Sequence, residues 1–260
     1  SEQKKLFFMI AFITGATSGI GKATAEIFAL NKWDLIITGR RKDRLEMIAY
    51  NLKKKNKIKV LPLCFDIRYL KEVVKYITAL SAEWKNIDLL VNNAGLAAGL
   101  NTIQNGSIDD WERMIDTNIK GLLYVTRHIA PMMIQNGKGH IVNVASVAGK
   151  EVYPSGNVYC ATKFAVDALS RAMRIDMHNH GIRVTNVAPG LVETEFSLVR
   201  FKDDEERAKK IYQDIIPLTA QDIAEIIYWA VTRPSHVNIS DVTVTPSAQA
   251  NAYLVHRKNL

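Results

Sequence analysis

Tyr159 and Lys163 are the residues of this 260-residue chain whose types and spacing most directly permit chemistry. They are four positions apart at the start of a helical pattern, so both side chains lie on one face of the helix. A free tyrosine has a pKa of about 10 and is a poor base at neutral pH, but a neighbouring ammonium favours the phenolate. The pair therefore predicts proton transfer at a substrate oxygen.

Ser146 strengthens this interpretation because it follows an apolar run at 139–145 that predicts a strand. A hydroxyl at the carboxyl end of a strand is well placed to hydrogen-bond a substrate oxygen. Two plainer alternatives stay open. Ser146 can serve as a turn cap, and a Tyr-x-x-x-Lys spacing also arises by chance in surface packing.

A glycine-rich turn, Thr14-Gly15-Ala16-Thr17-Ser18-Gly19-Ile20-Gly21, separates the first predicted strand from the first predicted helix. Glycines in this position let the backbone turn tightly and approach a pyrophosphate, whose charge the helix N-terminus stabilises. The spacing Gly-x-x-x-Gly-x-Gly differs from the usual Gly-x-Gly-x-x-Gly, so the prediction depends on the strand and helix around it. It indicates a dinucleotide site, and the alternative is a simple connecting turn.

The second predicted strand is followed by Arg40 and Arg41, with no carboxylate before Asp43. A site for NAD places an Asp or Glu here to bind the ribose hydroxyls. Two guanidinium groups instead suit a 2′-phosphate, which arginine binds through charge-assisted hydrogen bonds. The alternative is a pair of solvated residues at a helix start. The sequence therefore predicts NADP(H) as the cofactor.

Strand-like and helical patterns alternate along the chain, which predicts an α/β fold with a doubly wound parallel sheet. Several strands are continuously apolar, as strands buried on both faces are. The predicted strands are 6–13, 34–38, 58–64, 87–91, 139–145, 182–188 and 240–245, and the predicted helices are 20–31, 42–54, 68–82, 108–136, 157–180, 203–214 and 219–232. With no repeat or linker, residues 1–260 are predicted to form a single domain.

The segment 191–218 interrupts this alternation and contains the charge run 202–207. It leaves the carboxyl edge of the sheet, where ligands bind in open α/β folds, so it predicts a mobile substrate lid. A solvated surface helix explains the charges themselves. Within the lid, Arg200 is a hypothetical clamp for a substrate carboxylate, because arginine binds carboxylates in a bidentate manner. A surface role for Arg200 is the alternative.

The net charge of +8 is concentrated in residues 40–59, where nine basic and two acidic side chains leave +7. Only Tyr50 is interleaved with these cations, so a nucleic-acid partner is not favoured. The histidines His128, His178 and His180 have no partners at reliable ligand spacing, so no metal site is predicted.

The apolar run 6–13 follows Lys4 and Lys5, but its eight residues fall short of the roughly 20 that cross a bilayer. It ends in the glycine turn rather than at a cleavage site, which favours a buried strand over a signal peptide. The two cysteines, Cys64 and Cys160, provide no disulfide framework. These features predict a cytoplasmic protein with no membrane partner.

Together and in this order, the motifs resemble those of the short-chain dehydrogenase/reductase family over essentially the full length of the chain. They are Thr14–Gly21, Asp66-Ile67, Asn92-Asn93-Ala94-Gly95, Asn118, Ser146, Tyr159-x-x-x-Lys163 and Pro189-Gly190 with Thr194. The resemblance implies a Rossmann-type sheet of seven strands in the order 3-2-1-4-5-6-7. It also implies hydride transfer between a nicotinamide and a hydroxyl or carbonyl carbon.

The resemblance further implies a role for each matched residue. Tyr159 exchanges the proton with the substrate oxygen, and Ser146 polarises that oxygen. Lys163 lowers the pKa of Tyr159 and binds the nicotinamide ribose, while Asn118 holds a water that connects Lys163 to solvent. The predicted cofactor-binding residues are Gly15, Thr17, Ser18, Gly19, Ile20, Gly21, Arg40, Arg41, Asp66, Ile67, Asn93, Ala94, Gly95, Tyr159, Lys163, Pro189, Gly190, Leu191, Val192 and Thr194. Ser146, Tyr159 and Arg200 are the predicted substrate contacts.

Segments 92–97, 156–159, 195–202 and 234–239 are most similar to NADP-dependent 3-hydroxy acid dehydrogenases. This likeness implies oxidation of serine, L-allo-threonine, 3-hydroxypropionate and related 3-hydroxy acids, or reduction of malonic semialdehyde. It also implies a cytosolic homotetramer that packs helices 108–136 and 157–180 across two-fold axes. The alternatives are a 3-oxoacyl carrier-protein reductase, a general carbonyl reductase of the same family, or a non-catalytic NADP-binding protein.

Overall fold

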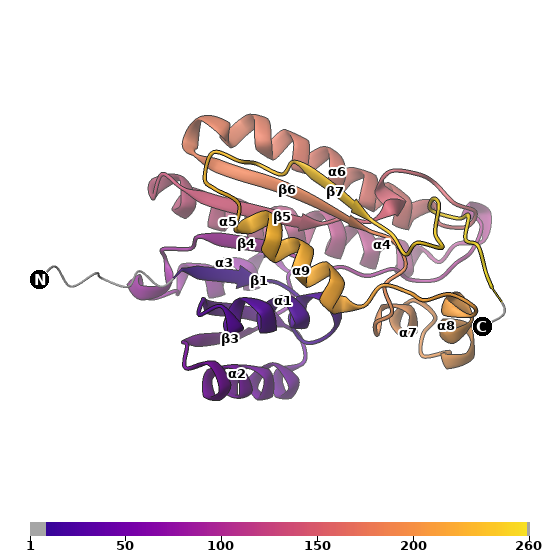
Figure 1. Ribbon diagram of the computed structural model, residues 1–260, viewed down its shortest axis with the longest axis horizontal. Coiled ribbons are helices and arrows are strands. Elements are labelled where there is room, and N and C mark those ends of the chain that lie inside the picture. The colour runs from indigo at the N-terminus through magenta and orange to yellow at the C-terminus, as the bar shows by residue number, and fades with distance from the viewer. Residues whose placement is uncertain (1–8, 259–260) are drawn as a thin grey trace, which may run out of the picture.

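Seven parallel strands form one sheet in the order β3-β2-β1-β4-β5-β6-β7 in the computed structural model, which describes residues 9–258 (Figure 1). The strands are β1 (Ile10–Ile13), β2 (Asp34–Gly39), β3 (Val60–Cys64), β4 (Leu89–Asn92), β5 (Gly139–Val144), β6 (Ile182–Pro189) and β7 (Asp241–Val244). The predicted fold and strand order are confirmed. Positions 6–8 of the first predicted strand lie outside the described residues.

Helices cover both faces of this sheet (Figure 1). They are α1 (Gly19–Leu30), α2 (Lys42–Asn56), α3 (Leu70–Thr78), α4 (Ile108–Ile115), α5 (Leu122–Gln135), α6 (Asn157–Met177), α7 (Phe196–Arg200), α8 (Glu205–Tyr212) and α9 (Ala220–Val231). Helices α1, α2 and α9 contribute to the core on one face, and α3, α5 and α6 contribute to the core on the other. None of the helices in residues 9–258 combines the length and the apolar character that crossing a membrane requires.

Neighbouring side chains of a strand enter the cores on opposite faces of the sheet, which explains why the strand sequences are continuously apolar. On β1, Phe12 belongs to the core under α3, α5 and α6, while Ala11 and Ile13 belong to the core under α1, α2 and α9. Successive side chains of a strand point to opposite faces, so a strand covered on both sides needs apolar residues at every position. Burial on both faces therefore accounts for the continuous apolar sequence of the central strands.

The direction of strand progression reverses at β1, which pairs with β2 on one side and β4 on the other. Connections leaving the carboxyl ends of β1 and β4 then run to opposite faces of the sheet and leave a crevice between them. The glycine turn at 14–21 follows β1, and segment 93–95 follows β4. The fold thereby brings two of the predicted cofactor motifs to one edge.

Three predicted helices differ in detail from the structure. The predicted helix 68–82 is shorter than expected, since α3 ends at Thr78. The predicted helix 108–136 consists of α4, a π-helical segment at Asp116–Gly121 and α5. The predicted helix 157–180 ends its α-helical part at Met177 and continues as a short 3₁₀ turn. The π-helical segment contains Asn118, and such widened turns are frequent at functional sites.

The predicted lid, residues 191–218, forms α7 and α8 beyond the carboxyl edge of the sheet (right side of Figure 1). Its two ends are joined at the base. Leu218 donates its backbone N–H to Leu191 O at 3.0 Å, and Glu193 donates to Leu218 O at 2.8 Å. The lid therefore leaves and returns at one place beside β6, and the predicted charged helix within it is α8.

Gly149 lies where the connection after β5 meets α6. A Cβ at this position would stand 2.5 Å from the backbone oxygen of Lys163. No side chain fits at that distance, so the glycine sets how closely the connection approaches the helix that contains Tyr159 and Lys163.

We expect Gly149→Ala to displace α6, because the clash is with backbone. The substitution should lower the free energy of unfolding by about 1–3 kcal/mol and reduce kcat/KM as well. Urea unfolding and steady-state kinetics measure the two effects. Gly137→Ala is the control, since a Cβ there meets nothing within 4 Å and φ is +66°. It should cost about 1 kcal/mol through backbone strain and leave kcat/KM unchanged. Wild-type activity in Gly149→Ala would contradict the tight contact.

Candidate active site

A cavity of about 660 Å³ opens at the carboxyl ends of the strands, between the glycine turn and the lid. Its volume is in the range of about 300–1,000 Å³ that is typical of ligand sites. All of the predicted cofactor, catalytic and substrate residues line it except Gly21 and Asn118. Gly21 has a different role, because a Cβ there would stand 2.3 Å from Asn93 Nδ2 and 2.4 Å from Gly15 O. It allows α1 to pack against the turn.

The glycine turn is shaped to bring backbone close to a ligand. Gly15 and Gly19 have φ values of +68° and +51°, in the left-handed region that favours glycine. The Thr14 hydroxyl accepts the backbone N–H groups of Asn93 and Ala94, each at 3.0 Å. The Asn93 amide in turn donates to Thr14 O at 2.9 Å. These bonds fix the turn against β4 and leave the N-terminus of α1 directed at the cavity.

The two predicted arginines take different positions after β2. Arg41 donates through Nη2 to the hydroxyls of Thr17 at 2.9 Å and Ser18 at 2.7 Å. Arg40 Nη1 lies 3.8 Å from a carboxylate oxygen of Asp66. Burial raises the pKa of Asp66, but its hydrogen bonds with Arg68 and the charge of Arg40 outweigh burial and leave this pKa below its ordinary value. One end of the cavity therefore contains two hydroxyls and a guanidinium, a set that suits a phosphate.

Tyr159, Lys163 and Ser146 converge at the opposite end of the cavity, and all three are buried. Lys163 Nζ donates to Val144 O at 2.9 Å and lies 5.9 Å from the centroid of the Tyr159 ring. The Ser146 hydroxyl accepts the backbone N–H of Ala148 at 3.1 Å, so it also caps the following turn. The turn-cap interpretation of Ser146 is therefore observed, and its hydrogen bond to a substrate oxygen stays a prediction.

Burial dominates the proton affinity of this pair. It raises the pKa of Tyr159 well above its ordinary value of 10, and Tyr153 adds to the rise, while Ser146 and Arg200 oppose it. Burial also lowers the pKa of Lys163 to about 8. The lowering of the Tyr159 pKa that the resemblance assigns to Lys163 stays a prediction. Removing both groups from water is a larger effect than their interaction over this distance.

Asn118 joins three segments behind the cavity. Its Nδ2 donates to Leu96 O at 2.8 Å and to the Thr162 hydroxyl at 3.0 Å, and its Oδ1 accepts Leu96 N–H at 2.9 Å. The side-chain amide therefore holds α6 to the loop after β4. Its predicted part in holding a water stays a prediction.

Arg200 extends from the end of α7 into the cavity, where it lies beside two phenols. Its Nη2 donates to the Tyr153 hydroxyl at 2.9 Å, and its Nε donates to Gly99 O at 3.3 Å. The guanidinium carbon is 5.5 Å from the ring centroids of both Tyr153 and Tyr159. Sequence reasoning missed Tyr153, which belongs to no motif. The available signal was an aromatic residue six positions before Tyr159, on the connection that leads into α6.

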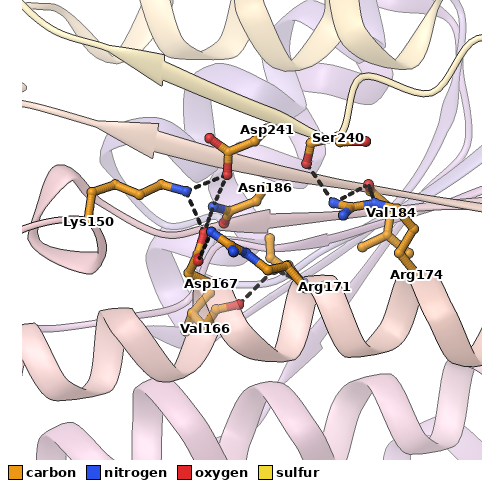
Figure 2. Close-up of polar contacts among 11 residues, drawn as sticks. Lys150, Val166, Asp167, Arg171, Arg174, Val184, Asn186, Ser240 and Asp241 are labelled. Carbon is orange, nitrogen blue, oxygen red and sulfur yellow. Dashed lines mark hydrogen bonds and ion pairs between the residues drawn. The ribbon is translucent and has the colours of Figure 1, made fainter.

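A polar cluster behind the site ties the connection after β5 to α6 and β7 (Figure 2). Lys150 Nζ reaches carboxylate oxygens of Asp167 at 2.5 Å and Asp241 at 2.6 Å. Asn186 on β6 donates to the same two oxygens at 2.9 and 2.8 Å. Because Lys150 follows Ser146 closely and Asp167 follows Lys163, this cluster holds the two catalytic segments at a fixed separation.

Within residues 9–258, no three His, Cys, Asp or Glu side chains group together as ligands for a metal ion. His140 is buried in the sheet. Burial, followed by the charge of Arg183, lowers the His140 pKa to about 3, and the ring bonds the Thr185 hydroxyl at 2.7 Å. It is a neutral structural residue.

Comparison with known proteins agrees with this geometry. A family model described as short chain dehydrogenase matches residues 9–205, which include the glycine turn, Ser146, Tyr159 and Lys163. The chain belongs to the short-chain dehydrogenase family. Family membership also accounts for the strand order and for the convergence of these motifs at one end of the sheet.

Two curated relatives and one solved structure show how far the likeness extends. The NADP-dependent 3-hydroxy acid dehydrogenase YdfG of Salmonella typhi is 46% identical over 96% of this chain and 100% of its own length. Sulfoacetaldehyde reductase 2 of Chromohalobacter salexigens is 44% identical over 95% of this chain and 98% of its own. The closed form of a serine dehydrogenase complexed with NADP⁺ has a TM-score of 0.90 at 44% identity, over 96% of this chain and 100% of that one.

Replacing Lys163 separates its role in chemistry from its cost in stability. We expect Lys163→Met to reduce kcat by at least about 100-fold, because the site loses its buried ammonium. The same variant should melt no lower than the wild type at pH 7. Thermal unfolding between pH 7 and pH 10 and steady-state kinetics test both expectations.

The pH dependence of this difference follows from linkage. The Lys163 pKa is about 8 in the folded chain against an ordinary 10.5, so between these values the unfolded chain binds more protons. Wild-type stability therefore gains from Lys163 as the pH rises through this window, whereas methionine does not titrate. The stability advantage of Lys163→Met over the wild type should be largest at pH 7 and shrink toward pH 10. An advantage that grows with pH would contradict a buried ammonium.

Proposed function

We propose that this chain is an NADP-dependent dehydrogenase that interconverts small 3-hydroxy acids with the corresponding 3-oxo acids. Serine, L-allo-threonine and the 3-hydroxypropionate/malonic semialdehyde pair are the substrates we favour. The proposal depends on one observation above all. A buried phenol, Tyr159, and a guanidinium, Arg200, lie side by side in a cavity whose far end contains Arg41 and the glycine turn.

The residues present fit NADP(H). Left-handed Gly15 and Gly19 shape a turn whose backbone would approach the pyrophosphate. A Cβ at Gly15 would stand 2.8 Å from Ala94 Cα, so the turn needs glycine there to pack against segment 93–95. Arg41, with the hydroxyls of Thr17 and Ser18, would bind the 2′-phosphate. Relatives that depend on NADP, together with a neighbouring structure complexed with NADP⁺, support the same cofactor.

The catalytic side chains would donate or accept the proton at the substrate oxygen, while NADP(H) would supply or accept the hydride. Tyr159 gives its proton to the carbonyl oxygen during reduction and takes it from the hydroxyl during oxidation. Its raised pKa keeps the phenol protonated at neutral pH, which favours the donor role. Ser146 would donate a hydrogen bond to the same oxygen. Lys163, with a pKa of about 8, can supply or accept a proton near neutral pH.

Arg200 would bind the acid group of the substrate. Its guanidinium is held by Tyr153 and Gly99 O, so it is oriented before any ligand arrives. Arginine binds carboxylates through paired, charge-assisted hydrogen bonds. Placed beside Tyr159, it suits a short substrate whose acid group lies close to the reacting carbon. A 3-hydroxy acid meets that requirement.

Reduction of a small sulfonated aldehyde is a second candidate activity. The 44% identical sulfoacetaldehyde reductase supports it, because a sulfonate presents the same negative charge to Arg200 as a carboxylate does. Rates with sulfoacetaldehyde and malonic semialdehyde, measured side by side with NADPH, separate the two. The substrate with the higher kcat/KM identifies the acid group that the cavity prefers.

The remaining alternatives differ in one measurement each. A 3-oxoacyl carrier-protein reductase would prefer a thioester substrate, and a general carbonyl reductase would accept neutral ketones equally well. A non-catalytic NADP-binding protein would turn over none of these.

A cytoplasmic homotetramer is part of the proposal. Exposed apolar residues such as Leu123 on α5 and Phe164 and Ile175 on α6 support helix contacts between subunits. Analytical ultracentrifugation measures the assembly state.

Tyr159→Phe tests the central chemistry. The variant keeps the ring but loses the proton, so kcat should fall by at least about 100-fold while the Kd for NADPH changes little. Stopped-flow kinetics and fluorescence titration of NADPH give the two quantities. Near-wild-type turnover in this variant would contradict the assignment of Tyr159.

Arg200→Ala tests the clamp. We expect kcat/KM for serine to fall by about 10- to 100-fold, because a hydrogen-bonded charge pair is lost, and kcat/KM for a neutral secondary alcohol to change little. Arg207→Ala is the matched control, since that guanidinium belongs to the same lid but packs on Phe201. Equal losses on the acid and on the alcohol would refute the clamp.

A further inference from the structure

Glu195 joins the lid to the start of α2 through a pair of arginines. One carboxylate oxygen is 2.7 Å from Arg41 Nη1 and the other is 2.7 Å from Arg44 Nη1. Glu195 directly follows Thr194 and precedes α7, whereas Arg41 directly precedes α2. Both Glu195 and Arg41 line the cavity. The contact therefore crosses the cavity from the lid to the arginine end.

The contact is made by the Arg41 nitrogen that donates to neither Thr17 nor Ser18. Its Nε and Nη2 are directed at the hydroxyls of Thr17 and Ser18, and Nη1 is directed at Glu195. Arginine binds a phosphate by presenting neighbouring N–H groups to two oxygens. A phosphate at Arg41 must therefore share this edge of the guanidinium with Glu195 or displace it.

The charges at this end of the cavity favour displacement. Hydrogen bonding with Arg41, and then with Arg44, holds the pKa of Glu195 below its ordinary value, so the carboxylate is ionised at neutral pH. A 2′-phosphate is close to dianionic at that pH, and two anions beside one guanidinium repel each other. Arg44 offers the displaced carboxylate a second cation, so Glu195 can leave Arg41 without losing every partner.

We infer that Glu195 is an internal competitor for the 2′-phosphate at Arg41, and that it lowers the affinity for NADP(H) but not for NAD(H). The inference rests on the proposed function, specifically on Arg41 as the phosphate-binding residue. It also connects cofactor identity with the lid, since a 2′-phosphate breaks the contact between Glu195 and Arg41 that NAD(H) leaves in place. Glu195 is thus a specificity-determining residue that opposes the preference of Arg41 for NADP(H) over NAD(H).

Direct binding measurements on the full chain test the inference. The ligands are NADPH, NADH and 2′,5′-ADP, which has the 2′-phosphate but no nicotinamide, titrated at low ionic strength. We expect Glu195→Gln to tighten NADPH and 2′,5′-ADP by about two- to tenfold and to leave NADH unchanged. The gain should diminish at about 0.5 M salt, because the pair is partly exposed and salt screens it.

Glu193→Gln is the matched control, since it removes the same charge from an exposed position on the same loop. It should shift all three affinities by less than about twofold. If Glu195→Gln instead weakens NADPH and NADH by the same factor, the carboxylate is a clamp that closes the lid over any dinucleotide, and the inference is overturned. Unchanged binding of 2′,5′-ADP overturns it as well.

Arg41→Ala distinguishes failure of this inference from failure of the cofactor assignment. If Arg41→Ala leaves the ratio of NADPH to NADH affinity unchanged, then Arg41 does not bind the phosphate and the proposed site is wrong. If Arg41→Ala abolishes that ratio while Glu195→Gln does not alter it, the site stands and the competition is refuted. Thermal unfolding of each variant confirms that the titrated protein is folded.

Discussion

The buried ammonium of Lys163 is the interaction on which the arrangement of the site depends. Its Nζ donates to the last carbonyl of β5, that of Val144, and burial lowers its pKa to about 8. Glycines lie close to this lysine on two sides. A Cβ at Gly95 would stand 3.6 Å from Nζ, and one at Gly149 would meet the backbone of Lys163 itself. The fold thus tolerates an unfavourable charge where proton transfer requires one.

The strands and the α/β class were predictable from the sequence because their causes are local, whereas the strand order came from the family resemblance. Apolar runs buried on both faces define the strands, and the predicted second strand, 34–38, differs from β2 by one residue. The π-helical segment was not predictable, since Asn118 bonds Leu96 and Thr162, which are 22 and 44 residues away. No pattern within a helix specifies contacts at that separation.

The same distinction between local and distant causes applies to the site. The glycine turn, Ser146, Tyr159 and Lys163 are parts of short motifs, so spacing identified them, and the fold needed only to bring them to one edge. The direction of the Tyr159 pKa shift depends on how much water the surrounding side chains exclude, which the sequence does not report. The sequence did not predict the pairing of Glu195 with Arg41 either, because the two residues are 154 positions apart.

The closed base of the lid has a consequence for how such proteins diversify. Hydrogen bonds between 191–193 and Leu218 bring the two ends of the segment together, so its interior can change in length at little entropic cost to the sheet. Every residue assigned to proton transfer lies outside it, and the proposed acid clamp, Arg200, lies within it. The segment is therefore an exchangeable module, in which new substrates can be acquired while the reaction itself is inherited intact.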